Sequence, residues 1–214
     1  MVYLSTCMGK IQPIRQIEEV TDEPPSLHGR AMDNLAFIRE TMEKSAVFTS
    51  VPGYGGMLMG VTACVAAYIA HSQTSVRLWL ITWLLEACLA FAIGVLAMWQ
   101  KSKLSNLPLI SAPSKKFVMN SLPAMICGVV ITLGLWRFGM FEIMIPIWLL
   151  LYGASVVTGG SFSVKAVPIM GWCFIAVGTI AFFLPTTYGN LLMAIGFGVL
   201  HIIFGFIIGR KFGG

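Results

Sequence analysis

LITWLLEACLAFAIG, residues 80–94, is an apolar run with a single carboxylate, Glu86, near its centre. Apolar sequence continues on both sides over about residues 78–99, enough for one helix to cross a hydrocarbon core about 30 Å thick. An unpaired charge at the centre of such a helix costs at least about 2.5–3.5 kcal/mol. We therefore expect Glu86 either to be protonated and hydrogen-bonded or to line a polar cavity.

The composition of the whole chain indicates a membrane protein. Of its 214 residues 57% are hydrophobic and only 11% are charged, whereas an average soluble domain has about 25% charged residues. Seven of the nine acids fall in residues 1–54, and only Glu86 and Glu142 follow. This division predicts a polar head followed by a body of lipid-spanning helices, which is an all-α polytopic fold.

Six apolar runs are long enough to be transmembrane helices. They cover about residues 55–71, 78–99, 118–137, 141–158, 166–184 and 190–208. The sequence thus predicts three regions. They are a mobile polar N-terminus at 1–25, an amphipathic juxtamembrane helix and turn at 26–54, and a six-span bundle at 55–214.

Lys and Arg residues predict which way the bundle faces, because cytoplasmic loops are enriched in them. If the N-terminus is cytoplasmic, twelve of the fourteen basic residues lie on the inner side, and only Arg77 and Arg137 lie outside. The predicted topology is therefore N-in and C-in. The loop at 100–117 carries four lysines that would lie against an anionic inner leaflet, and we interpret them as topology determinants.

The segment SLHGRAMDNLAFIRETMEK, residues 26–44, has apolar side chains at helical spacing. Ser26 fits as an N-cap, and Leu35, Ile38 and Met42 fall on one face. The pattern predicts an amphipathic cytoplasmic helix of about 20 residues. Three roles stay open for it: lying in the membrane interface, packing against a sister subunit, or docking on a protein partner.

Small residues recur at four-residue spacing in three of the apolar runs. The pairs are Gly56 and Gly60 in the first run, Ala90 and Gly94 in the second, and Gly205 and Gly209 in the last. Helices in membranes associate through close backbone contact at such residues. We interpret the pairs as helix-packing sites within one chain, with a homodimer face as the alternative.

Glu86 and His201 are the only strongly titratable residues far from a predicted helix end. With the N-terminus inside, their two spans both run from outside to inside. Glu86 then lies about 12 Å into its span and His201 about 16 Å into its own, at similar depth. We hypothesise that they form one proton-sensitive site. The alternative is that each makes a structural hydrogen bond to a neighbouring backbone group, Thr or His.

Motifs of known enzymes are missing from the sequence. It has no Gly-x-Ser-x-Gly, no His-Glu-x-x-His and no phosphate-binding Gly loop. Its five cysteines include no Cys-x-x-Cys pair, so we expect no metal, no cofactor and no catalytic residue. Nucleic-acid binding is not expected either, because the basic residues lie at the ends of apolar runs and form no stripe with aromatic residues.

Three segments carry a resemblance to a known family. DNLAFIRETMEKSAVFTSVPGYGG (33–56), WLLLYGASVVTGGSFSV (148–164) and GFGVLHIIFGFIIGRKFGG (196–214) resemble a family of uncharacterised six-helix inner-membrane proteins from bacterial genomes. The resemblance implies the same fold and a location in the cytoplasmic (inner) membrane. It implies no activity and no functional residue.

Two functions are expected ahead of the others. The first is a non-enzymatic membrane protein that senses a signal, or transports a small solute or protons, with Glu86 and His201 at its polar centre. The alternative is a membrane scaffold or assembly subunit that acts through the N-terminal helix and the Gly-rich helix faces. An enzyme acting on lipid ranks third. The expected partners are the lipid bilayer and either a second copy of the chain or another membrane or cytoplasmic protein.

Overall fold

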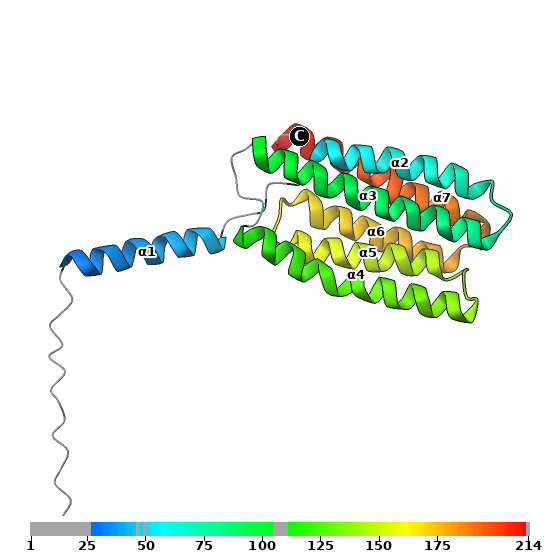
Figure 1. Cartoon of the computed structure of the whole chain (residues 1–214), viewed down its shortest axis with the longest axis horizontal. Helices are drawn as coiled ribbons and strands as arrows, with labels where there is room; N and C mark the ends of the chain where they lie inside the picture. The colour runs from blue at the N-terminus through cyan, green and yellow to red at the C-terminus, as the bar shows by residue number, and fades with distance from the viewer. Residues whose placement is uncertain (1–26, 46–47, 49–50, 105–110, 213–214) are drawn as a thin grey trace, which may run out of the picture. The chain divides into compact units, whose positions relative to one another are not determined.

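The computed structural model of the chain describes residues 27–45, 48, 51–104 and 111–212. Within these ranges every named element is a helix (Figure 1), and the β-type pairing is limited to an isolated bridge between Phe48 and Ser163. The prediction of an all-α fold is confirmed for this part of the chain. The mobile N-terminus predicted at 1–25 lies outside the described residues.

The described residues divide into two units between Thr41 and Met42. Helix α1 (Leu27–Ser45) begins in the first unit, in the segment where the sequence predicts an amphipathic helix. Its cytoplasmic position stays a prediction. Three apolar side chains on one face of α1 are exposed, namely Leu35 at 60%, Ile38 at 52% and Met42 at 69%.

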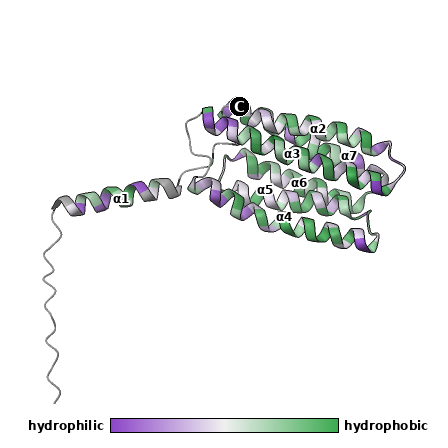
Figure 2. Ribbon diagram, viewed as in Figure 1, coloured by the Kyte–Doolittle hydropathy of each residue, from purple (hydrophilic) through white to green (hydrophobic). Residues whose placement is uncertain are grey.

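The helices of the second unit follow one another through short connections. They are α2 (Gly53–His71), α3 (Val76–Leu104), α4 (Ala112–Phe138), α5 (Met144–Gly160), α6 (Ala166–Phe183), the 3-10 turn η1 (Thr186–Tyr188), α7 (Gly189–Met193), the π-helical segment η2 (Ala194–Leu200) and α8 (His201–Phe212). Five stretches are long and apolar enough to cross a membrane, namely α2, α3, α4, α6 and Thr186–Phe212. Helix α5 is apolar but shorter, with 17 residues. Hydrophobic residues occur along all of these helices (Figure 2), which supports a membrane protein.

Helices α3 and α4 extend beyond the apolar runs that predict them. Helix α3 continues to Leu104 instead of ending near residue 99, and α4 begins at Ala112 instead of 118. The early start of α4 follows from a capping box. The hydroxyl oxygen of Ser111 accepts from the backbone N–H of Ser114 (3.3 Å), and that of Ser114 accepts from the N–H of Ser111 (2.8 Å). Hydropathy detects only the apolar part of a helix, whereas its polar ends depend on capping.

Helix α2 packs against α3 and also against the C-terminal elements η2 and α8. Its glycines allow a close approach to the C-terminal elements. A Cβ on Gly60 would lie 2.6 Å from the carbonyl oxygen of Gly198, and one on Gly56 would lie 3.4 Å from Cα of Gly205. Gly209, one turn further along α8, contacts the start of α2. The Gly56–Gly60 pair of α2 and the Gly205–Gly209 pair of α8 therefore lie on helix surfaces that face each other within one chain.

The remaining small-residue contacts also lie inside the bundle. A Cβ on Gly94 of α3 would lie 3.4 Å from Sδ of Met59 on α2, and Ala90, one turn earlier, is half-buried. Helix α5 packs against both α4 and α6. A Cβ on Gly153 of α5 would lie 2.8 Å from the carbonyl oxygen of Gly171 on α6. Close contact between helix backbones is thus a general feature of this unit.

The core of the second unit lies where α5, α6 and α7 meet. Its largest fully buried side chains are Met144, Leu149, Phe174 and Met193. Two of them also line η2, because a Cβ on Gly196 would meet the side chains of Leu149 and Phe174. The π-helical segment is therefore packed directly on the core.

Candidate functional site

Glu86 lies in the middle of α3 and turns toward α2. Its side chain is 8% exposed, and its Oε1 accepts a hydrogen bond from Thr62 Oγ1 at 2.8 Å. The same hydroxyl is 2.9 Å from the carbonyl oxygen of Met59. A hydroxyl has one hydrogen and two lone pairs, so a protonated Glu86 also fits this geometry. It would donate to Thr62, and Thr62 would then donate to Met59.

His201 is the first residue of α8, and its side chain is 6% exposed. Its Nε2 lies 2.8 Å from the hydroxyl oxygen of Tyr152 on α5. The backbone of Gly196 and Phe197 lies beside the ring, but nothing among the described residues meets the geometry of a hydrogen bond with Nδ1. Nε2 of this buried ring is therefore bonded to a side chain, and Nδ1 has only the backbone of the preceding turn beside it.

Aromatic rings enclose the imidazole of His201. The ring centroid of Tyr152 is 4.7 Å from that of Phe174 and 5.0 Å from that of Phe197, and the imidazole centroid is 5.5 Å from that of Phe174. The four rings come from α5, α6, η2 and α8. A charge on the imidazole would be costly in such apolar surroundings, since only a neutral phenol is bonded to it.

The π-helical segment immediately before His201 helps to place the ring. Segments of this kind are rare and often occur at functional sites. Two glycines let this one approach its neighbours: a Cβ on Gly196 would lie 2.5 Å from Cδ2 of Leu149, and one on Gly198 would overlap Sγ of Cys64 on α2. Local backbone geometry and small residues thus bring His201 to Tyr152.

Glu86 and His201, which the sequence analysis joins in one site, have different partners in the structure. Glu86 bonds to Thr62 on α2, and His201 bonds to Tyr152 on α5. Neither side chain forms a hydrogen bond with the other. The bundle therefore contains two separate polar pairs. The bond from Thr62 to Glu86 matches the alternative of a hydrogen bond to a threonine, although the sequence analysis named neither Thr62 nor Tyr152 as a partner. Tyr152 could have been suspected, because a tyrosine within an apolar run usually needs a partner for its hydroxyl.

A second polar cluster links α3 to the start of α7. Asn190 Oδ1 accepts from the indole N–H of Trp79 at 2.8 Å and lies 3.4 Å from Nε1 of Trp83. Trp79 also stacks on Trp148 of α5, with 5.8 Å between centroids and 1° between planes. The indole N–H of Trp148 donates to Thr132 Oγ1 on α4 at 2.8 Å. This end of the bundle is thus held by one buried indole, that of Trp83, and two half-buried ones, those of Trp79 and Trp148, whose N–H groups all have acceptors.

The described part of the chain contains no group of three or more His, Cys, Asp or Glu side chains able to hold a metal ion. Comparisons with known proteins find no family model that matches the chain, and no curated protein or solved structure that matches it. The site is therefore interpreted from its own chemistry. A buried imidazole–phenol pair and a carboxyl–hydroxyl pair can hold, release or exchange protons.

Proposed function

We propose that the chain is a non-enzymatic integral membrane protein with six transmembrane helices, N-in and C-in, that responds to protons. Its polar centre consists of the His201–Tyr152 and Glu86–Thr62 pairs. It serves either to sense pH or to couple protons to the transport of a small solute. The observation that carries the proposal is the buried imidazole of His201 bonded to the hydroxyl of Tyr152, because ionisable groups inside membrane bundles are typically functional.

The packing of α5 supports a sixth span. At 17 residues α5 is about 26 Å long, near the lower limit for crossing a bilayer. It packs against both α4 and α6, which are long enough to cross. The connections on either side of α5 are only five residues long. These short connections and contacts support α5 as a sixth span beside its two neighbours.

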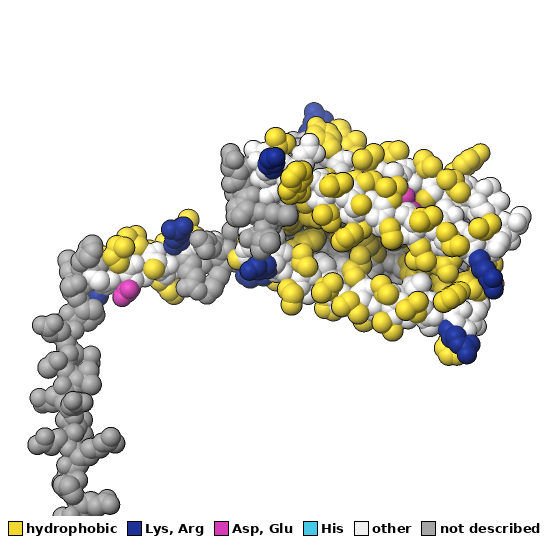
Figure 3. All heavy atoms as spheres, viewed as in Figure 1, with side chains coloured by type: hydrophobic (Ala, Val, Ile, Leu, Met, Phe, Trp, Pro, Cys, Tyr) yellow, Lys and Arg dark blue, Asp and Glu magenta, His cyan; other side chains and the backbone are white. Residues whose placement is uncertain are grey.

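The distribution of basic residues supports the orientation. In the body, Lys and Arg side chains gather at the ends of the helices, and apolar side chains cover the visible face between them (Figure 3). Arg77 and Arg137 lie at one end. The other end has a larger set, which is Lys101, Lys103, Lys115, Lys116, Lys165, Arg210 and Lys211. The richer end is expected to be cytoplasmic.

Protonation of His201 would change the hydrogen bond that joins α5 to α8. A neutral imidazole can accept from the hydroxyl of Tyr152, whereas a protonated imidazole donates from both nitrogens. Tyr152 must then turn from donor to acceptor at Nε2, whereas Nδ1 carries a proton in both states and lies beside the backbone of Gly196 and Phe197. The protonation state of one ring is in this way coupled to the contact between two helices.

The test uses the full-length protein in liposomes that contain a pH-sensitive dye. We expect a proton flux or a pH-dependent change in tryptophan emission for the wild type, its loss in His201→Gln, and a weaker response in Tyr152→Phe. His71→Gln changes an exposed histidine at the end of α2 and should behave as the wild type. An unaltered response in His201→Gln would overturn the proposal.

A scaffold or assembly subunit is the second candidate, favoured by the exposed Leu35, Ile38 and Met42 on α1. Exposed apolar side chains at helical spacing are typical of helices that dock in a groove. A Leu35→Asp and Ile38→Asp double variant should lose a partner that co-purifies with the wild type. Phe37→Asp changes an exposed side chain on the opposite face of α1 and should keep that partner.

A further inference from the structure

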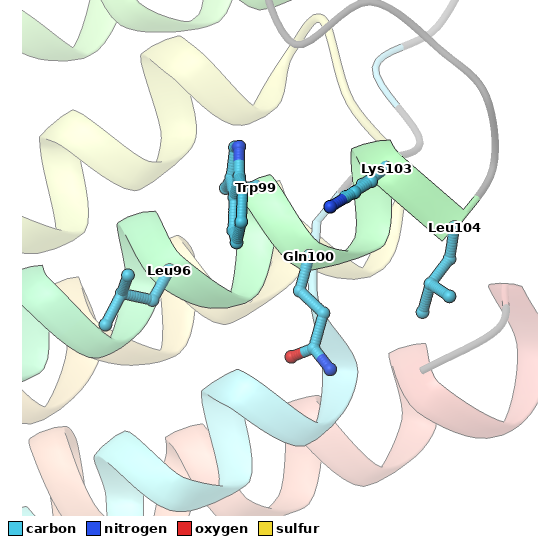
Figure 4. Close-up of a pocket in the computed structure, with 5 residues that line it drawn as sticks. All are labelled: Leu96, Trp99, Gln100, Lys103 and Leu104. Atoms are coloured by element: carbon cyan, nitrogen blue, oxygen red, sulfur yellow. The ribbon is translucent and has the colours of Figure 1, made fainter.

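A groove of about 740 Å³ lies along the last turns of α3 (Figure 4). The described residues that line it all lie on one face of α3, because they follow the spacing i, i+3, i+4, i+7 and i+8. They are Leu96, Trp99, Gln100, Lys103 and Leu104.

The groove changes from apolar to polar along its length. Leu96 and Trp99 are 63% and 53% exposed. The end of the groove nearer the middle of α3 therefore presents an apolar surface. Lys103 reaches back over Trp99, with Nζ 5.3 Å from the centroid of the indole ring (Figure 4). The amide of Gln100 adds a second polar group. An apolar floor with a cation and an amide at one end matches the chemistry of a phospholipid.

The depth of these residues agrees with that assignment. If α3 enters the hydrocarbon core near residue 78, a core about 30 Å thick ends about 20 residues later, near Met98. Trp99 then lies at the boundary, where tryptophan is enriched. Lys103 lies about 7 Å further out, in the headgroup layer, which is about 5–8 Å thick on each side.

The charge around the groove favours an anionic headgroup. The acids in the described body are Glu86, in the middle of α3, and Glu142, next to the opposite end of the bundle. No carboxylate of the body residues 51–104 and 111–212 therefore lies at the end that holds Lys103. Lys101, two residues earlier, points elsewhere and donates to the carbonyl oxygens of Val51 and Phe212 at 2.9 and 3.2 Å.

We propose that this groove binds an anionic phospholipid of the inner leaflet. The headgroup phosphate lies against Lys103 and the amide of Gln100, and an acyl chain extends along Trp99 and Leu96. The proposal goes beyond the polar centre and depends only on the membrane orientation of α3. It assigns Lys103 a role in lipid binding in addition to its effect on topology.

The test measures lipid binding to the full-length protein in detergent by native mass spectrometry and thermal shift. The probes are phosphatidylglycerol, phosphatidylcholine and soluble glycerol phosphate. We expect the wild type to prefer phosphatidylglycerol, and Lys103→Gln to bind it about fivefold more weakly, since one basic group near an anionic surface is worth about that factor. Lys165→Gln removes an exposed cation at the same end of the bundle, on the loop between α5 and α6, and should bind as the wild type.

Three outcomes would overturn the lipid site. They are equal binding of the two lipids, an equal loss in Lys103→Gln and Lys165→Gln, and binding of glycerol phosphate as tight as that of phosphatidylglycerol. Leu96→Trp fills the groove without changing its charge and should also weaken phosphatidylglycerol binding. An unchanged melting temperature of the lipid-free variant is the control for its folding. Recovery of the wild type in the soluble fraction of cells would instead contradict the proposed membrane architecture.

Discussion

The hydroxyl oxygen of Tyr152 lies 2.8 Å from Nε2 of His201, so a phenol on α5 and an imidazole at the start of α8 share one hydrogen bond inside the bundle. The residues are 49 positions apart in the chain. Their contact links α5, which packs on α4 and α6, to α8, which packs on α2. A change at this bond is therefore expected to act on both groups of helices.

Tyr152→Phe removes the hydroxyl but keeps the ring that packs against Phe174 and Phe197. The buried Nε2 of His201 loses its partner, which should lower the free energy of unfolding by about 1–3 kcal/mol. Reversible unfolding in mixed micelles measures this difference. Tyr68→Phe changes a side chain that is 79% exposed and should stay within about 0.5 kcal/mol of the wild type. Equal small effects of the two variants would contradict the prediction.

Glu86 and Thr62 should be energetically coupled. In a double-mutant cycle with Glu86→Ala and Thr62→Val, we expect an interaction of about 0.6–1.5 kcal/mol, the usual range for a hydrogen bond between helices in a membrane. Thr62→Ser retains the hydroxyl and should retain the coupling. An interaction energy of zero in this cycle would show that the 2.8 Å contact between Thr62 and Glu86 contributes nothing to stability.

Glu86 and His201 should be independent of each other, because they bond to different helices. The effects of Glu86→Ala and His201→Ala on the free energy of unfolding should add to within about 0.5 kcal/mol. The same unfolding assay applies, with the Glu86–Thr62 cycle as the positive control. Coupling above about 1 kcal/mol would favour a single shared site.

Gly60→Ala should destabilise the protein by about 1–3 kcal/mol through overpacking. The added methyl group would lie 2.6 Å from the carbonyl oxygen of Gly198 and 2.9 Å from the backbone nitrogen of Ile202, and backbone cannot move aside as a flexible side chain can. Gly134→Ala is the matched control, since a Cβ there meets nothing within 4 Å. It should be neutral or should stabilise the helix by up to about 1 kcal/mol. A reversed order of the two variants would contradict the packing of α2 on η2.

Asn190→Leu should disturb the indole cluster. It removes the acceptor of the Trp79 N–H and leaves that group unpaired, so we expect a shifted tryptophan emission and a loss of about 1–3 kcal/mol. Asn120→Leu is the control, because Asn120 is exposed and its amide donates to the Lys116 carbonyl of its own helix, at 2.8 Å. Unchanged emission in Asn190→Leu would show that this contact does not hold Trp79 in place.

The amino-acid sequence by itself determined the all-helical fold and the apolar character of the helices. Hydropathy is a local property, and a run of about 20 apolar residues has few alternatives to a helix that hides its backbone polar groups. The small residues Gly56, Gly60 and Gly205 were also recognisable, because close helix packing depends on the absence of a large side chain, which is visible in the sequence. The ends of α3 and α4 were harder to predict from the sequence, since a cap such as Ser111 lies outside the apolar run.

Only the tertiary structure decided which polar groups meet. A hydrogen bond is usually about 2.7–3.2 Å long, so the partners of Glu86 and His201 depend on the rotation and depth of each helix. One residue corresponds to about 100° of rotation on a helix. A π-helical segment such as η2 therefore redirects every side chain that follows it, His201 included. For that reason two acid–base groups at similar predicted depth lie on different pairs of helices. Tyr152 and Thr62 could be assigned as their partners only from the packed helices.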